Sequence, residues 1–184
     1  MKPASSIDDF LDSRCSVEFT WRQLIEAGDT FKRLAPAPLA QLPAARESWA
    51  NLASLAQLLD QVVAKFGRIE VTYGFAPPAL TKFITHGIAP RLDQHAAAEV
   101  SAPGKLVCPR GGAAVDFIVA GRPMDEVVRW IIGNLSVDRL YFYGPSRPVH
   151  MSWHPRPARS FYFMKQGPSG RLIPKPLQLE EMTK

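Results

Sequence analysis

One long amphipathic segment constrains the fold of this chain more than any other feature. Between Arg46 and Phe66, apolar residues recur at intervals of three and four, the spacing that places side chains on one face of an α-helix. These residues are Leu52, Leu55, Leu58, Leu59, Val62, Val63 and Phe66. Gly67 follows in a position where helices commonly end. A helix of this kind needs a sheet or other helices to cover its apolar face.

Shorter elements flank this helix, and 17 prolines separate them. Further helices are predicted over 20–25, 77–85, 93–100 and 124–132, and a loop is predicted over 35–43. Strands are predicted over 69–73, 114–119, 139–143, 149–153 and 160–164. This order, helices first and then mostly strands, predicts an α+β fold in which helices pack on a central antiparallel sheet.

The length and composition are those of one globular domain. A chain of 184 residues can bury roughly two-thirds of its unfolded surface, and 46% hydrophobic against 21% charged residues is typical of a globular protein. We therefore predict a single domain over residues 1–184. Its ends, residues 1–18 and 167–184, are expected to be extended or partly disordered.

The sequence favours a cytoplasmic protein without a membrane span. The first residues carry early acids and no apolar stretch of the kind found in signal peptides. No apolar run approaches the roughly 18 residues of a transmembrane helix. The two cysteines, Cys15 and Cys108, are too few for a disulfide framework, so reduced thiols are expected.

The net charge of +5 is mildly basic. Part of the excess lies in the C-terminal third, at Arg147, Arg156, Arg159, Lys165 and Arg171. A nucleic-acid partner is compatible with this charge, but a solvated basic surface is the favoured interpretation.

A carboxylate within an apolar strand is the first candidate for chemistry. Asp116 has Val115 and Phe117 as neighbours, and burying an unpaired carboxylate is costly. Asp116 is therefore expected to bind a metal, several donors, or a basic partner such as Arg110 or Arg147.

Two histidines in the 149–153 region are candidates for the same site. His150 and His154 are four residues apart, so on a strand they would share one face. The alternatives are a structural histidine at position 150 and a surface histidine at position 154.

Four segments in a fixed order resemble the M15 family of zinc peptidases, which have the hedgehog/D,D-peptidase-like fold. The helix opening Phe19-Thr20-Trp21, the strand that runs from Ile69 into Gly74-Phe75, Gly112-Ala113-Ala114-Val115-Asp116, and Val149-His150-Met151-Ser152 are similar to successive motifs of that family. The resemblance covers roughly residues 18–154. It implies a peptidase or amidase that hydrolyses a peptide bond, with the peptides of peptidoglycan as one expected substrate.

The resemblance also implies a zinc ion held by His95, Asp116 and His150, with His154 as the replacement for His95. A catalytic zinc takes three nitrogen or oxygen ligands and leaves one position open for water. It lowers the pKa of that water to about 7.

This sequence departs from the family pattern at three points. The family's first zinc histidine falls seven residues before the aspartate, where this chain has Pro109, so His95 requires an insertion. The family's substrate-binding arginine is replaced by Ala76, and residues 145–149 lack the family's general base. Glu99 is our candidate base, because on a helix it would share one face with His95. The alternatives for Glu99 are a solvent-exposed residue or a partner that orients His95.

These departures leave a second function open. The chain is either an active peptidase or a catalytically impaired binding module of the same fold, with a protein or nucleic-acid partner.

Overall fold

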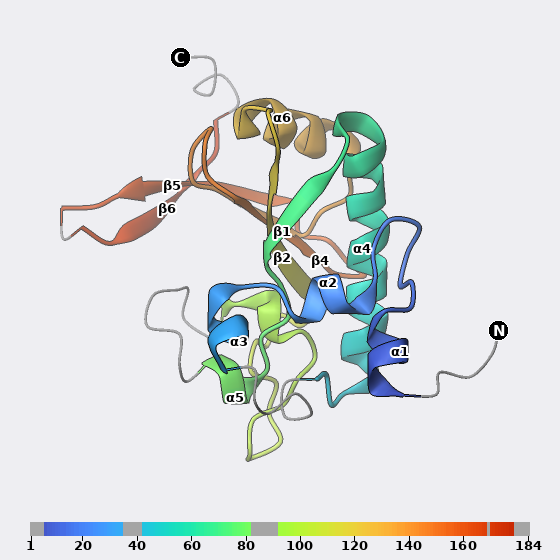
Figure 1. Ribbon diagram of the computed structural model, residues 1–184. Helices are drawn as coiled ribbons and strands as arrows, with labels where there is room; N and C mark the ends of the chain where they lie inside the picture. The colour runs from blue at the N-terminus through green and yellow to red at the C-terminus, as the bar shows by residue number, and fades with distance from the viewer. Residues whose placement is uncertain (1–5, 35–41, 82–91, 169, 179–184) are drawn as a thin grey trace.

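The computed structural model describes residues 6–34, 42–81, 92–168 and 170–178 and has an α+β architecture (Figure 1). The helices are α1 (Ile7–Leu11), α2 (Trp21–Ile25), α3 (Asp29–Leu34), α4 (Arg46–Phe66), α5 (Pro78–Thr81) and α6 (Met124–Asn134), with a 3₁₀-helix η3 (Gln94–Ala96). The strands are β1 (Ile69–Tyr73), β2 (Ala113–Val119), β3 (Arg139–Phe142), β4 (Val149–Trp153), β5 (Ser160–Gln166) and β6 (Leu172–Pro176). None of the described helices combines the length and the apolarity needed to cross a bilayer.

The six strands form one sheet in the order β1-β2-β4-β3-β5-β6. The prediction of a purely antiparallel sheet is wrong at one place, because β3 and β5 pair in parallel. The reason lies in the occupancy of the strand edges. β4 already has β3 on one side and β2 on the other, so β5 pairs with the free edge of β3. Because β5 runs opposite to β4, and β4 runs opposite to β3, β5 is parallel to β3.

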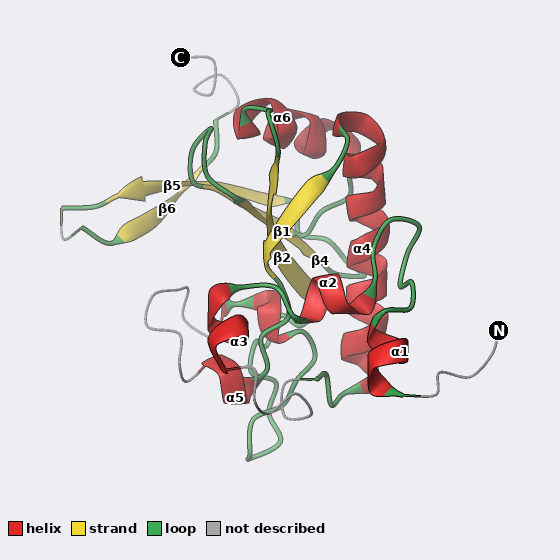
Figure 2. Ribbon diagram, viewed as in Figure 1, coloured by secondary structure: helices red, strands yellow, loops and turns green. Residues whose placement is uncertain are grey.

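Helices α4 and α6 cover one face of the sheet, and the main core lies between them and the strands (Figure 2). Of the residues predicted for the apolar face of α4, Leu52, Leu55, Leu59 and Val62 are at most 1% exposed. Phe66 is partly buried and meets Trp130 of α6 edge to face. The prediction that this helix faces the core is therefore confirmed.

Replacing Leu59 with alanine should lower the free energy of unfolding by about 2–5 kcal/mol, because the side chain is fully buried and would leave a cavity. Chemical denaturation measures this change. Leu58→Ala is the matched control, since Leu58 lies next to it on α4 and is only partly buried. An equal loss of stability in both variants would contradict the assignment of the core face.

The predicted helix over 93–100 is replaced by the three-residue helix η3. Asp93 caps η3 by accepting a hydrogen bond from the backbone N–H of His95. Ala97 then takes a positive φ of 49°, a conformation that ends a right-handed helix. His95 and Glu99 therefore do not share a helical face.

The two ends of the chain are more ordered than expected where the structure describes them. Residues 7–11 form α1, which begins at a Ser6 cap and buries Leu11, and residues 172–176 pair with β5 as β6. Of the predicted helix over 77–85, α5 accounts for Pro78–Thr81, while 82–85 lie outside the described residues. Most of the predicted loop, residues 35–41, also lies outside them.

Candidate metal centre

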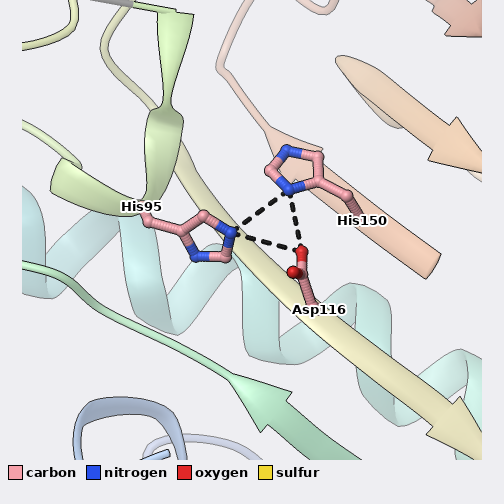
Figure 3. A group of neighbouring side chains, drawn as sticks. All are labelled: His95, Asp116 and His150. Carbon is pink, nitrogen blue, oxygen red and sulfur yellow. Dashed lines mark hydrogen bonds and ion pairs between the residues drawn. The ribbon is translucent and has the colours of Figure 1, made fainter. Parts of the chain in front are cut away.

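Three side chains from separate segments converge on one face of the sheet (Figure 3). Asp116 of β2 and His150 of β4 are direct partners across adjacent antiparallel strands, and His95 reaches them from η3. Residues on either side of Asp116, Val115 and Phe117, belong to the main core. Because side chains alternate along a strand, Asp116 and His150 point away from α4 and α6.

The spacing of the three side chains fits a single metal ion. His95 Nε2 lies 3.2 Å from Asp116 Oδ1 and 3.2 Å from His150 Nδ1. His150 Nδ1 lies 2.9 Å from Asp116 Oδ1. A tetrahedral ion with bonds of about 2.0 Å holds its ligands about 3.3 Å apart. These atoms therefore need to move apart only slightly to bind one.

The centre is buried on its histidine side and open on its carboxylate side. His95 and His150 are 3% and 2% exposed, whereas 27% of the Asp116 side chain remains accessible. Among the described residues, these three form the one cluster of histidine, cysteine or acidic side chains with metal-ligand spacing. The buried His–Asp–His cluster can thus hold a metal ion and leave a position for a further ligand.

The backbone around β1 fixes the orientation of the His95 ring. His95 Nδ1 lies 2.8 Å from the carbonyl oxygen of Gly74. A carbonyl only accepts, so Nδ1 carries a proton and Nε2 is the atom available to a metal. The backbone N–H of Ala76 also donates to the His95 carbonyl. Ala76 thereby ties down the loop that carries His95.

Gly74 is required where β1 passes α2. A Cβ at this position would lie 2.0 Å from the carbonyl oxygen of Leu24, far inside van der Waals contact. The glycine lets the two backbones approach. It thereby places the carbonyl that holds His95.

Electrostatics favour the charged forms of Asp116 and His95. Burial alone would raise the pKa of Asp116, but the two neighbouring histidines hold it well below its usual range. Burial alone would lower the pKa of His95, but the carboxylates of Asp93 and Asp116 raise it to about 9. Without a metal, the cluster is therefore held by charge-assisted hydrogen bonds, and a metal must displace a proton from His95.

A buried polar network supports the loop that carries His95. Gln94 donates to Gly111 O and Asp138 Oδ2, each at 2.9 Å, and accepts from Ser152 Oγ, also at 2.9 Å. Asp138 is fully buried and pairs with Arg110. Gln94 precedes His95, and Ser152 follows His150 by two residues, so the network joins the segments that supply two of the three clustered side chains.

Asp138→Asn should make unfolding less sensitive to acid. Burial raises the pKa of Asp138, but the hydrogen bonds from Arg110, Ala158 and Gln94, with the charge of Arg110, together outweigh it and the net shift is downward. A lowered folded-state pKa stabilises the protein above the unfolded value of about 4, and this contribution is lost as the pH falls further. Urea unfolding at pH 7, 5 and 3 should show a larger loss in the wild type. Equal losses between pH 5 and 3 would contradict this role.

The structure does not bring Glu99 into the cluster. Its carboxylate Oε1 accepts from the N–H groups of Ala44 and Ala45, both at 3.1 Å, and from the hydroxyl of Ser48 at 2.7 Å. These donors lie at the N-terminus of α4, where an anion is favoured. Ala45 itself provides no side-chain cap, so Glu99 supplies one from a distant segment. The hypothesis that Glu99 is the general base is therefore not supported by its position.

His154 and the two candidate arginines also lie outside the cluster. His154 follows the end of β4, and its Nδ1 accepts a hydrogen bond from the backbone N–H of Arg156 at 3.0 Å. Arg110 pairs with Asp138 rather than with Asp116. Arg147 lies over the ring of Tyr143. The alternative of an Asp116–arginine ion pair with either residue is wrong.

Two tyrosines next to the cluster were not singled out from the sequence. The ring of Tyr73 meets His95 edge to face, with centroids 4.4 Å apart, and the ring of Tyr141 lies 5.0 Å from His150. The Tyr73 hydroxyl is buried and has no hydrogen-bond partner among the described residues. The alternation in 69–73 placed Tyr73 on one face of its strand, but its proximity to a histidine 22 positions later required the tertiary structure.

Comparison of the chain with family models, with curated proteins and with solved structures found no match.

Proposed function

We propose that this protein is a zinc-dependent hydrolase that cleaves a peptide bond, in the manner of the M15 peptidases and with the same fold. The observation that carries the proposal is the convergence of His95, Asp116 and His150 on one point, which would leave the fourth position of a tetrahedral ion to water or substrate. The motifs that supply these residues occur in the same order as in that family. Peptides of the bacterial cell wall are the proposed substrates.

The donor set supports zinc over other common ions. Two imidazole nitrogens and one carboxylate oxygen are typical of catalytic zinc sites, whereas magnesium and calcium prefer all-oxygen sites. When bound, zinc supplies an acidified water and polarises a substrate carbonyl. The chain's own residues would hold the ion: Gly74 orients His95, and the pairing of β2 with β4 fixes Asp116 beside His150.

Hydrolysis of wall peptides tests the proposal directly. Zinc-loaded protein should release products with one new carboxylate and one new amine from purified muropeptides, as detected by mass spectrometry. His150→Ala should abolish the cleavage, because the metal loses a ligand. His154→Ala should retain it, because His154 lies outside the cluster. Absence of cleavage by zinc-loaded wild type would overturn the peptidase assignment.

A second function, that of a binding module, is favoured because the site, among the described residues, lacks a carboxylate that could act as a general base. No carboxylate other than Asp116 belongs to the cluster within the described parts of the chain, and Glu99 is held by α4. A metal-containing binding module that has lost hydrolysis agrees with these observations. Zinc retention without cleavage would support it.

A further inference from the structure

The sheet ends in two edge strands, β1 and β6, and the sequence protects only one of them. β6 contains Pro174 and Pro176, which have no N–H group to pair with a further strand. β1 contains no proline. Apart from its pairing with β2, the backbone of β1 has no hydrogen-bond partner in the described part of the chain. The outward-facing N–H and C=O groups of β1 are therefore available to another extended backbone.

A groove of about 730 Å³ runs along this free edge. Residues 68–71 line one wall of the groove. Because successive side chains of a strand point to opposite faces, a wall made of consecutive residues is the edge of the strand rather than one of its faces. The facing wall is α2, with its N-cap Thr20 and, one turn later, Gln23. The volume lies within the range of ligand sites, roughly 300–1,000 Å³.

The groove is closed where α2 meets the C-terminal end of β1. At that end the N–H of Phe75 donates to the carbonyl oxygen of Leu24 at 2.7 Å, and Figure 1 shows α2 beside the end of β1. Residues 68–71 precede this contact, and four residues of extended chain span about 13 Å. Because the facing wall is a helix, the groove has room for one short strand and not for a second sheet.

The side chains in the groove favour an acidic occupant. Phe19 and Ile69 supply buried apolar surface, whereas Lys32 and Arg68 are exposed. Neither cation has an ion pair among the described residues. Arg22, on the wall formed by α2, is already paired with three carboxylates. Glu70 is an exposed acid in the same groove, so the groups without an ion pair there have a net positive charge.

We propose that an extended acidic segment of a partner protein binds in this groove and adds to β1 as a new edge strand. Strand addition draws its affinity from main-chain hydrogen bonds and its specificity from alternate side chains. Apolar side chains of the segment would contact Phe19 and Ile69, and acidic ones would reach Lys32 and Arg68. This binding goes beyond the proposed hydrolysis, because none of the three candidate metal ligands lines the groove.

Titration of ¹⁵N-labelled protein with acetyl-Val-Glu-Val-Glu-amide, followed by NMR, tests the proposal. The amide signals of β1 and α2 should shift, and the outward-facing amides of β1 should exchange with solvent more slowly in the complex. Two further peptides carry N-methyl groups on both valines or on both glutamates. The pair of N–H groups that faces β1 lies on alternate residues, so one of these peptides should bind roughly 5- to 150-fold more weakly, the equivalent of two backbone hydrogen bonds.

Charge reversal at the groove tests the choice of an acidic segment. Arg68→Glu should weaken binding of the glutamate peptide by roughly 2- to 5-fold, the scale of one exposed ion pair. It should strengthen binding of acetyl-Val-Lys-Val-Lys-amide. Lys105→Glu, at an exposed cation outside the groove, should change neither. If the NMR spectrum of Arg68→Glu shows an unfolded protein, Lys32→Glu replaces it and should have the same two effects.

Four outcomes would overturn the proposal. Equal binding of both N-methylated peptides and the parent would exclude strand addition. Slow exchange of the outward-facing β1 amides before any peptide is added would mean that the chain itself covers the edge. Shifts of β1 signals with protein concentration alone would assign the edge to a second copy. Shifts confined to the surroundings of His150 would assign the peptide to the candidate metal centre. Repeating the titration with a chelator present, where binding should persist, keeps this test separate from the proposed hydrolysis.

Discussion

Protein produced without a histidine tag and dialysed against zinc should retain one zinc ion per chain. Replacing His95, Asp116 or His150 with alanine should lower the affinity by more than about 100-fold, because loss of an outer partner of a metal ligand alone costs about 10- to 100-fold. The three ligand atoms lie within 4.8 Å of one another. Atomic emission gives the metal content, and competition with a chromogenic chelator gives the affinity.

His154→Ala is the matched control for these variants. It removes a histidine four residues after His150 that lies outside the cluster, so zinc content should be unchanged. Zinc should also raise the stability of the wild type, by about 2.7 kcal/mol when free zinc is 100 times the dissociation constant. It should have no such effect on Asp116→Ala. A folded wild-type protein without zinc, or loss of zinc in His154→Ala, would exclude the assigned centre.

Glu99→Ala should destabilise the fold by about 2–4 kcal/mol without reducing the zinc content. Glu99 is 5% exposed, and its carboxylate accepts from Ala44, Ala45 and Ser48. Removing it leaves these donors without their partner at a helix N-terminus, where hydrogen bonds to a charged group contribute about 1.5–3 kcal/mol each to stability. Water can replace part of this contribution at Ala44, which is exposed. Denaturant unfolding and metal analysis of the same sample measure both quantities.

A solvent-exposed acid of the same helix end provides the comparison. Glu47→Ala changes an exposed acid in the first turn of α4 and should change stability by less than about 1 kcal/mol. If Glu99→Ala left stability unchanged but removed activity, Glu99 would return as a catalytic candidate. Loss of stability with retained zinc would establish that it holds α4 in place.

The zinc and Glu99 predictions distinguish the residues that would bind the metal from the residues that hold those ligands in position. Glu99 ties the segment after His95 to α4, and Gln94 ties the segment before it to Asp138. Neither Glu99 nor Gln94 contacts the three candidate ligand atoms directly. Because the loop between His95 and Asp116 is long, such anchors are needed to hold His95 against two residues of the rigid sheet.

The sequence determined the elements whose pattern repeats locally. The three- and four-residue spacing of α4 identified its buried face, since a helix repeats every 3.6 residues. The acid within an apolar strand marked Asp116, because a buried carboxylate requires compensation. The same local pattern identified β4 as a strand and placed His150 on it.

Only the tertiary structure decided which distant groups meet. His95 lies 21 residues before Asp116, and the positive φ of Ala97 turns the chain so that Glu99 leaves the site and reaches α4. The parallel pairing of β3 with β5 follows from which strand edge was still free. This pairing places the ring of Tyr162 against the ring of Tyr141. The spacing of residues along the sequence does not predict these contacts. They depend on the paths of loops and on competition among partners that lie far apart in the chain.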